Sequence, residues 1–369
     1  MNRIDDLSII SSPCAIMILE SLPDEIFVEI FEYVSIQDLY RGFYSLNLRF
    51  RMIIASLTNL HGETTFEREL HSLPFRFFAS RITKFSMHHV DLMDLSPFSA
   101  VRSLTLYIEP NRAQCHVIRA FSHLKYLYIS QRPIDHFYYS VSLPHFVFTN
   151  AYPNLYTCQL NLISYRVQQH WTCIPSLHTL SVCLENPRVF TQILQSCPSL
   201  TRLKVELTQH FTRPTTRFDI APHVCLRRFY LYLNQTMFSC CDIIEILLSL
   251  VPNLTNLVIR GAASTVYSLN INSLADMLHR CVPKLQHFYL DMFIEESLSR
   301  MLTDSTKQQI GQLFRLFTNI QIYPSTQKVP ARLFIQGLNR NYFPFSVHYF
   351  LQESYYLDIS GNNISDKQF

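Results

Sequence analysis

The chain has 369 residues, of which 48% are hydrophobic and 16% charged, and its formal net charge is +3. So many apolar residues can build a large core, and they exclude disorder as the global state. The charge is nearly balanced and no long run of Lys and Arg occurs, so we expect no membrane partner and no bulk attraction to nucleic acid. The six glycines show no P-loop or G-x-G-x-x-G spacing, which argues against nucleotide binding through these motifs.

Ten cysteines occur without a C-x-x-C pair, and we expect reduced thiols that act as small hydrophobes rather than disulfides. Asp5 and Asp6 stand where a signal peptide would carry basic residues. No apolar run reaches the roughly 18 residues of a membrane span. We therefore expect a cytoplasmic or nuclear location, or both.

Residues 1–19 have Ser and Pro punctuation without periodicity and are expected to form an N-terminal tail. Residues 20–60 instead carry short helical patterns. Pro23 suits a first helical turn, and Asp24 and Glu25 suit the positive end of a helix dipole. Apolar residues then recur at helical spacing and predict one apolar stripe, formed by Ile26, Phe27, Ile30, Phe31 and Val34.

Two more short helices are expected in this segment. Ser35 and Asp38 form a capping-box pattern that opens a helix through Leu39. The apolar positions of a third helix are Leu46, Phe50, Ile53, Ile54 and Leu57. Three helices of this size cannot bury both faces of such stripes, so part of the apolar surface is expected to meet a partner.

The pattern Leu22-Pro23-x-Glu25-Ile26, with Ile30, Val34, Asp38-Leu39 and Asn47-x-Arg49-Phe50, resembles an F-box over roughly residues 20–55. The resemblance implies docking on the Skp-type adaptor of a cullin-RING ubiquitin ligase, and through it an association with a cullin. The contact residues that it implies are Leu22, Pro23, Ile26, Ile30, Val34 and Leu39. Many F-boxes carry a tryptophan near the third helix, whereas the one tryptophan here is Trp171.

Residues 61–80 are expected to connect this module to a repeat region, residues 81–325. Its unit is an apolar residue, two variable residues, an apolar residue, one variable residue and an apolar residue. Nine units begin at Ile82, Val101, Leu124, Leu155, Leu177, Leu200, Leu226, Leu254 and Leu285. Five of them carry a proline two residues before the first apolar position: Pro153, Pro175, Pro198, Pro252 and Pro283.

Each unit ends in period-2 alternation and predicts a short strand, and helical patterns precede several units, at 189–197, 243–251 and 274–282. A strand and a helix of this size cannot close a core alone, so neighbouring units should stack. This array resembles degenerate leucine-rich repeats, although the usual asparagine or cysteine after the strand is mostly absent. The alternative is an ordinary α/β domain with coincidental Leu-x-x-Leu strands.

The sequence thus predicts an α/β chain with a three-helix F-box-like module and a leucine-rich-repeat-like solenoid with a strand and a helix per repeat. Residues 317–322 resemble a weaker tenth unit, and residues 326–369 are expected to form a C-terminal repeat or cap. Residues 357–359 suggest a last strand before Gly361.

The variable positions of a stacked solenoid would point away from its core and could hold a target protein, because tyrosine and arginine anchor many interfaces. The alternative is that these tyrosines simply favour strands and pair with their neighbours. The candidate target-binding residues are Tyr107, Tyr126, Tyr128, Arg202, Lys204, Arg228, Tyr230, Tyr232, Arg260 and Tyr289, with His287 beside them.

No motif supports catalysis, a metal or a cofactor. Glu295-Glu296 read as a solvated turn, and adjacent His88-His89 would point to different sides of a strand. Cys240-Cys241 precede a helical stretch without a nominated histidine. The F-box resemblance instead implies a non-catalytic substrate-recognition subunit of an SCF-type ligase that binds a protein target. The alternatives are a repeat scaffold outside ubiquitination and a hydrolase hidden in the repeat region.

Overall fold

The structure is a computed structural model that describes residues 22–88, 94–130, 142–163, 171–207, 220–233, 240–262, 271–293, 304–323 and 332–338. Within these ranges the chain is α/β, and twelve strands follow the sheet order β1-β2-β3-β4-β5-β6-β7-β8-β9-β10-β12-β11. The chain divides into two compact units. Unit 1 comprises Met1–Val182 with Ser196–Ser199, and unit 2 comprises Cys183–Gln195 with Leu200–Phe369.

Unit 1 begins with the helical module, defined here as residues 22–57. It contains α1 (Asp24–Phe31), α2 (Ile36–Asp38), a π-helical turn η2 (Leu39–Phe43) and α3 (Leu48–Ser56). The predicted cap is present, because the Asp38 N–H donates to Ser35 Oγ at 3.1 Å. The second helix does not stop at Leu39 but continues as the π-turn. The module core is aromatic, with Phe27 packed edge-on against Phe50 at a centroid distance of 4.9 Å.

The segment expected to be a simple connection contains ordered structure: β1 (Leu60–Thr64), α4 (Glu67–Leu70), α5 (Leu73–Phe78) and a 3-10 turn η3 (Ala79–Arg81). β1 pairs in parallel with β2 (Ile82–Met87). The sequence did not predict this strand because it lacks the repeat pattern and because one of its buried positions is Gly62, which has weak strand preference. Arg81 joins the helical module to the sheet, since its Nη1 donates to the carbonyls of Ile54 at 3.1 Å and Ala55 at 2.8 Å.

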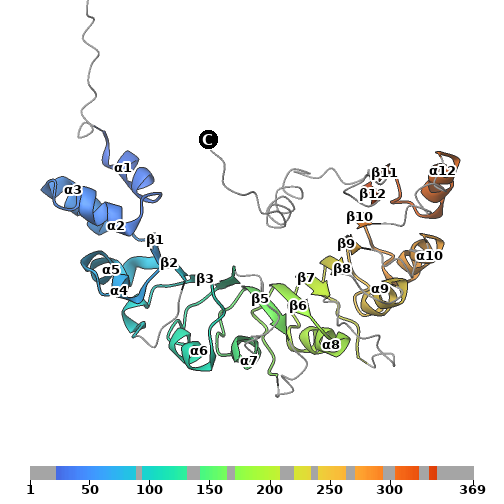
Figure 1. The fold of residues 1–369 in the computed structure, drawn as a ribbon, viewed down its shortest axis with the longest axis horizontal. Coiled ribbons are helices and arrows are strands. Elements are labelled where there is room, and N and C mark those ends of the chain that lie inside the picture. The colour runs from blue at the N-terminus through green and yellow to red at the C-terminus, as the bar shows by residue number, and fades with distance from the viewer. Residues whose placement is uncertain are drawn as a thin grey trace, which may run out of the picture. The chain divides into compact units, whose positions relative to one another are not determined.

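The repeat units of unit 1 form β2, β3 (Ser103–Leu106), β4 (Tyr126–Ile129) and β5 (Thr157–Ile163), which pair in parallel and in sequence order. β6 (Thr179–Leu184) follows β5 along the chain. Between these strands lie a 3-10 turn η4 (Ser96–Phe98), α6 (Arg112–Ile118) and α7 (Ser142–Phe148). α6 and α7 lie on one side of the strands (Figure 1).

The same backbone arrangement recurs where a unit enters its strand. In the unit that begins at Leu124, the first apolar residue occupies a turn, and its N–H donates to the Phe121 carbonyl at 3.2 Å. The next two N–H groups, of Lys125 and Tyr126, donate to the Arg102 carbonyl of the preceding unit at 2.7 and 2.9 Å. In eight of the nine repeat units the strand starts at the third residue, whereas β2 starts at the first residue of its unit, Ile82. All three apolar positions are buried in all nine repeat units.

In unit 2, four parallel strands lie in sequence order: β7 (Arg202–Leu207), β8 (Arg228–Leu233), β9 (Asn256–Ala262) and β10 (His287–Phe293). The helices are α8 (Pro187–Ser196), α9 (Cys240–Ser249), α10 (Ile271–Cys281) and α12 (Asp304–Leu313). Figure 1 shows α9 and α10 on one side of β8 to β10. The helical patterns at 189–197, 243–251 and 274–282 overlap with α8, α9 and α10. Each of these helices ends two or three residues before the proline of the following repeat unit.

The sheet order changes after β10. β11 (Asn319–Tyr323) is the strand of the weak tenth unit, but it does not pair with β10 as a sequential stack requires. β12 (Arg332–Leu338) lies between them and is antiparallel to both. The prediction that the tenth unit stacks on the ninth is therefore wrong. The suggested strand at residues 357–359 lies outside the described residues.

No helix in the described ranges combines the length and the apolar character that crossing a membrane requires.

Candidate interaction surfaces

The apolar stripe of α1 is divided between the inside and the outside of the helical module. Phe27 and Phe31 are each 1% exposed and pack with Phe50 in the module core. Ile26 and Ile30 are 39% and 43% exposed and lie one helical turn apart. Because a helix buries only the face that meets its neighbours, the predicted single stripe was too wide. The outer pair, Ile26 and Ile30, is the exposed apolar surface of α1.

The six residues that the F-box resemblance implies do not share one environment. Pro23, Ile26 and Ile30 are exposed, and Leu22 and Val34 are half-buried. Leu39 is 0% exposed, so it has no surface to offer a partner. We correct its role: Leu39 lies in the core of the module, and the remaining five residues are accessible.

Arg49 fixes the start of α1 relative to α3. Its guanidinium is 2.6 Å from the Asp24 carboxylate, donates to the Leu22 carbonyl and lies over the Phe27 ring at 5.5 Å. Both members of the ion pair are partly exposed, so its Coulomb energy is small and geometry is its main contribution. Arg49 therefore positions the Leu22-Pro23 segment that precedes the exposed pair on α1.

Further exposed apolar residues in the module were not singled out from the sequence. Tyr33 follows α1, and Leu48 and Met52 lie four residues apart on α3. The exposure of Leu48 and Met52 could have been predicted, because both positions lie about half a turn away from the core residue Phe50 on a helical wheel. Leu46 was expected in the helix core but is exposed, since α3 begins only at Leu48.

In unit 1 the candidate tyrosines lie on three different parts of β3 and β4. Tyr107 follows β3 and stacks on the His88 ring at a centroid distance of 4.0 Å. Tyr126 and Tyr128 lie on β4, opposite Ser103 and Thr105 of β3. Burial raises the pKa of Tyr128, so its hydroxyl stays protonated and remains a donor at neutral pH. Tyr126 and Tyr128 thus have short polar neighbours on β3, whereas Tyr107 is engaged with an imidazole ring.

In unit 2 the parallel register aligns the variable positions in three rows across the strands. The first row contains Arg202, Arg228, Asn256 and His287. The second contains Lys204, Tyr230, Val258 and Tyr289. The third contains Glu206, Tyr232, Arg260 and Asp291. The candidate residues of unit 2 thus lie on one side of adjacent strands, and two of their four Lys and Arg side chains, Arg202 and Arg228, lie in the first row.

A compact polar network joins Tyr289 of the second row to Arg260 and Asp291 of the third row. The Arg260 guanidinium lies over the Tyr289 ring at 5.0 Å and donates to its hydroxyl at 3.0 Å. Arg260 Nε is 3.8 Å from the Asp291 carboxylate, which accepts from the Tyr289 hydroxyl at 3.4 Å. The side chain of Asp291 is only 3% exposed, so its charge requires this partner. Arg260 and Tyr289 are therefore committed to an internal network, and the first row is the more available surface.

Two other candidate residues interact in the same way: Lys204 Nζ lies 5.1 Å from the centroid of the Tyr232 ring. This geometry allows a cation–π contact across β7 and β8. For Lys204 and Tyr232 this contact supports the alternative to target binding, in which residues on neighbouring strands pair with each other and stabilise the sheet.

The proposed chemical sites gain no structural support. Among the described residues, no group of three His, Cys, Asp or Glu side chains is placed to hold a metal ion. Glu295-Glu296 and His89 lie outside the described residues, and the side chains of Cys240 and Cys241 are likewise outside them.

In comparisons with known proteins, the chain matches no family model and no curated protein.

Proposed function

We propose that this protein is a substrate-recognition subunit of an SCF-type cullin-RING ubiquitin ligase. In this proposal the helical module is an F-box that docks on a Skp-type adaptor, and the strand repeats hold a protein target. The observation that carries the proposal is the outward position of Ile26 and Ile30 in a helix that opens with Leu22-Pro23.

The packing of the module supports a docking role for that pair. Phe27, Phe31 and Phe50 complete an aromatic core without help from Ile26 or Ile30. Two branched aliphatic side chains in water gain free energy when a partner covers them, at about 25 cal/mol per Å² of apolar area. The partner surface that suits them is an apolar groove, which is the mode by which amphipathic helices are commonly recognised.

We further propose that the repeat region is a leucine-rich-repeat-like solenoid. Support comes from the burial of the three apolar positions in all nine repeats, from the parallel and sequential pairing of strands within each compact unit, and from the turn that recurs before most of the strands. In such an array the variable positions form a continuous row of side chains for binding. The protein would then position its target for ubiquitin transfer without performing a covalent step itself.

The experiment is co-expression of the full chain with a Skp-type adaptor, followed by co-purification. The test variant is Ile26→Asp with Ile30→Asp, which should abolish the complex because it buries two unpaired charges at the interface. Pro23→Ala alone should weaken the complex modestly. The control is Leu73→Asp with Val224→Asp, because both residues are exposed and apolar but lie outside the module.

Complex formation by the wild type and the control but not by the α1 variant would support the proposal. If the α1 variant co-purifies at the wild-type level, the docking assignment is wrong. If the folded wild type forms no complex, the module is an end cap of a repeat scaffold. Deletion of the module is a poorer test, because Tyr44 packs on Phe77 at 4.7 Å and Arg81 bonds two carbonyls of α3.

A further inference from the structure

Charge is distributed unevenly over the nine repeat units. Each unit has three variable positions, its second, third and fifth residues, and none of these twenty-seven positions is Asp or Glu. Seven of them are Lys or Arg: Lys84, Arg102, Lys125, Arg202, Lys204, Arg227 and Arg228. The whole chain contains 31 Lys and Arg against 28 Asp and Glu, so overall composition does not explain this difference.

In unit 2 the basic residues meet at the starts of the strands. Arg202 of β7 lies directly opposite Arg228 of β8 in the parallel register. Like charges in this relation destabilise a sheet unless something compensates for them. The positive potential also reaches β10, because burial and the charge of Arg228 lower the pKa of His287. Arg227 adds a further cation beside this row, where its Nη1 donates to the Asn253 carbonyl at 3.0 Å.

The acidic residues of this sheet face lie at the other ends of the strands. Glu206 is four residues beyond Arg202 on β7, and Asp291 is four residues beyond His287 on β10. Asp291 is already engaged with Arg260. Because the strands are parallel, their starts form one edge, and that edge is basic while the opposite edge carries the carboxylates.

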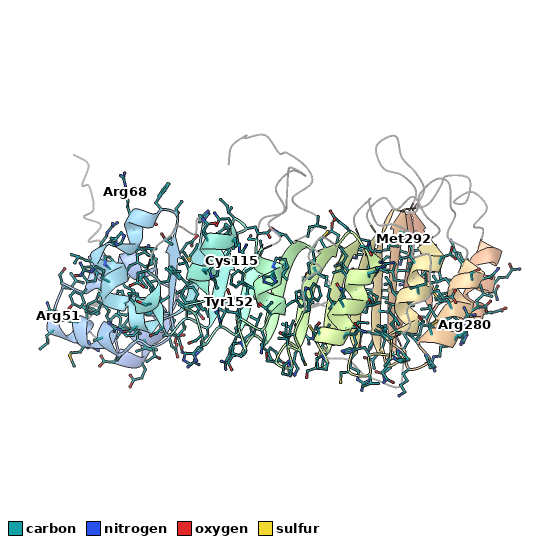
Figure 2. All side chains as sticks on the ribbon, turned by 90° about the horizontal axis from the view of Figure 1, so that it is seen from below. Arg51, Arg68, Cys115, Tyr152, Arg280 and Met292 are labelled. Carbon is teal, nitrogen blue, oxygen red and sulfur yellow. The ribbon has the colours of Figure 1, made fainter. Side chains whose placement is uncertain are left out.

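An arginine on the helix side has a carboxylate partner. Arg280 of α10, labelled in Figure 2, pairs with the Glu245 carboxylate of α9 at 2.8 Å. Among the described residues, no carboxylate lies within ion-pair distance of Arg202 or Arg228. The side chain of Arg202 is exposed and that of Arg228 is half-buried. A bound carboxylate would therefore neutralise a charge pair that no described carboxylate compensates.

We propose that the edge formed by the starts of β7 and β8 binds an acidic segment of a partner protein, with carboxylates seated at Arg202 and Arg228. Arginine suits this role because its planar guanidinium binds a carboxylate through two parallel hydrogen bonds. Tyr230 in the adjacent row offers apolar area for the side chains between the carboxylates. A nucleic acid fits less well, because a uniformly charged backbone that crossed the face would meet Glu206.

This inference rests on the proposed function only in that the strand face holds a protein target. Adaptor binding by the α1 pair is a separate property with a separate readout. Each variant below is therefore also tested for co-purification with the adaptor, which should be unchanged by substitutions on β7 and β8. Failure of the adaptor test alone would remove the ligase assignment and leave the acidic-segment proposal in place.

The test measures fluorescence anisotropy with a short labelled peptide rich in Glu and the full-length chain. A matched peptide with Gln at each Glu position reports the contribution of the carboxylates, and single-stranded oligo(dT) reports binding of a nucleic acid. We expect the Glu peptide to bind and the Gln peptide to bind at least tenfold more weakly, on the order expected from two partly exposed charge pairs. Binding should also weaken in high salt, since the Debye length is about 8 Å at physiological ionic strength.

The decisive variant is Arg202→Glu with Arg228→Glu, which should reduce the affinity for the Glu peptide by on the order of tenfold or more. The control is Arg112→Glu with Arg188→Glu, which changes the net charge equally at exposed positions near the starts of α6 and α8. If the β7–β8 variant unfolds, Arg202→Gln with Arg228→Gln replaces it. Equal affinity of test and control variants, equal binding of the two peptides, or binding of oligo(dT) in place of the Glu peptide would overturn the proposal.

Discussion

Gly261 in β9 provides the most direct test of the strand register in unit 2. Its φ is +144°, a backbone conformation that side-chain-bearing residues rarely adopt. It lies between Leu233 of β8 and Met292 of β10. A Cβ atom built there would be 2.0 Å from the Leu233 carbonyl oxygen, which is backbone and cannot rotate away. Gly261→Ala must therefore either distort β9 or separate it from β8.

Backbone strain of this kind costs about 1–3 kcal/mol, and overpacking costs about as much again. Gly261→Ala should accordingly destabilise the protein by about 2–6 kcal/mol, measured as a lower midpoint of urea unfolding and a lower melting temperature. The matched control is Gly42→Ala, because Gly42 lies in the π-helical turn with nothing within 4 Å of an added Cβ. That substitution should stabilise by about 0.5–1 kcal/mol. If Gly261→Ala and the wild type have the same urea midpoint and the same melting temperature, the register of β8, β9 and β10 at this point is wrong.

Three further substitutions test local interactions. Glu109→Gln should stabilise the protein at pH 8 by on the order of 1–3 kcal/mol, because burial raises the pKa of Glu109 from its ordinary 4.5 to about 7 despite a hydrogen bond from Asn161. Tyr152→Phe should be neutral or stabilise by about 1 kcal/mol, since the buried Tyr152 hydroxyl, beside Cys115 in Figure 2, has no hydrogen-bond partner in the described part of the chain. Asn47→Ala should destabilise the helical module by about 1 kcal/mol, because Asn47 Oδ1 caps α3 by accepting from the Phe50 N–H at 2.9 Å. Melting temperatures measured side by side report all three changes.

The pH dependence has a definite sign. Between about pH 4.5 and pH 7 the unfolded chain ionises Glu109 while the folded chain keeps it protonated. The contribution of Glu109 to the free energy of unfolding is therefore fully present below about pH 4.5 and is lost as the pH rises through about 7. The free energy of unfolding of the wild type minus that of Glu109→Gln should therefore change between pH 5 and pH 8. A constant difference would contradict the raised pKa. Destabilisation by Tyr152→Phe of more than 1 kcal/mol would mean that the hydroxyl has a partner, and an unchanged melting temperature for Asn47→Ala would argue against the cap.

The repeat pattern predicted most of the strands because it depends on a strong local signal. Alternation with period 2 decides which side chains of a strand face the core, and a proline precedes five of the nine repeat units. The apolar positions of all nine repeat units are buried as expected. The helices α8, α9 and α10 also follow from their periodicity and from the prolines that end them. The cap at Ser35 was predictable for the same reason, since capping is a contact between residues three apart.

What the sequence did not predict depends on contacts between distant residues. β1 is a strand because β2 provides its partner, although Gly62 has weak strand preference. β12 takes the place beside β10. Its Gly337 also lies against the residues before β11, where an added Cβ would be 1.6 Å from the Leu316 carbonyl oxygen. Nothing in the local pattern distinguishes these pairings from a sequential stack.

The candidate surfaces show the same division. The sequence correctly grouped Ile26, Phe27, Ile30 and Phe31 as apolar helical positions, but only the position of α3 decides which of them remain exposed. Leu39 matched the motif and yet is buried, because the chain continues beyond it as a π-helical turn. Likewise, the register across β7 and β8 is what places Arg202 opposite Arg228.

The measurement that tests the central claim most directly is hydrogen–deuterium exchange of the full chain, alone and with an equimolar Skp-type adaptor. The proposed F-box function predicts slower exchange of the amides in α1 and the flanking residues 22–34, with β7 to β10 unchanged. No complex with a folded chain would contradict the proposed function, and so would a complex whose protection falls only on the strands.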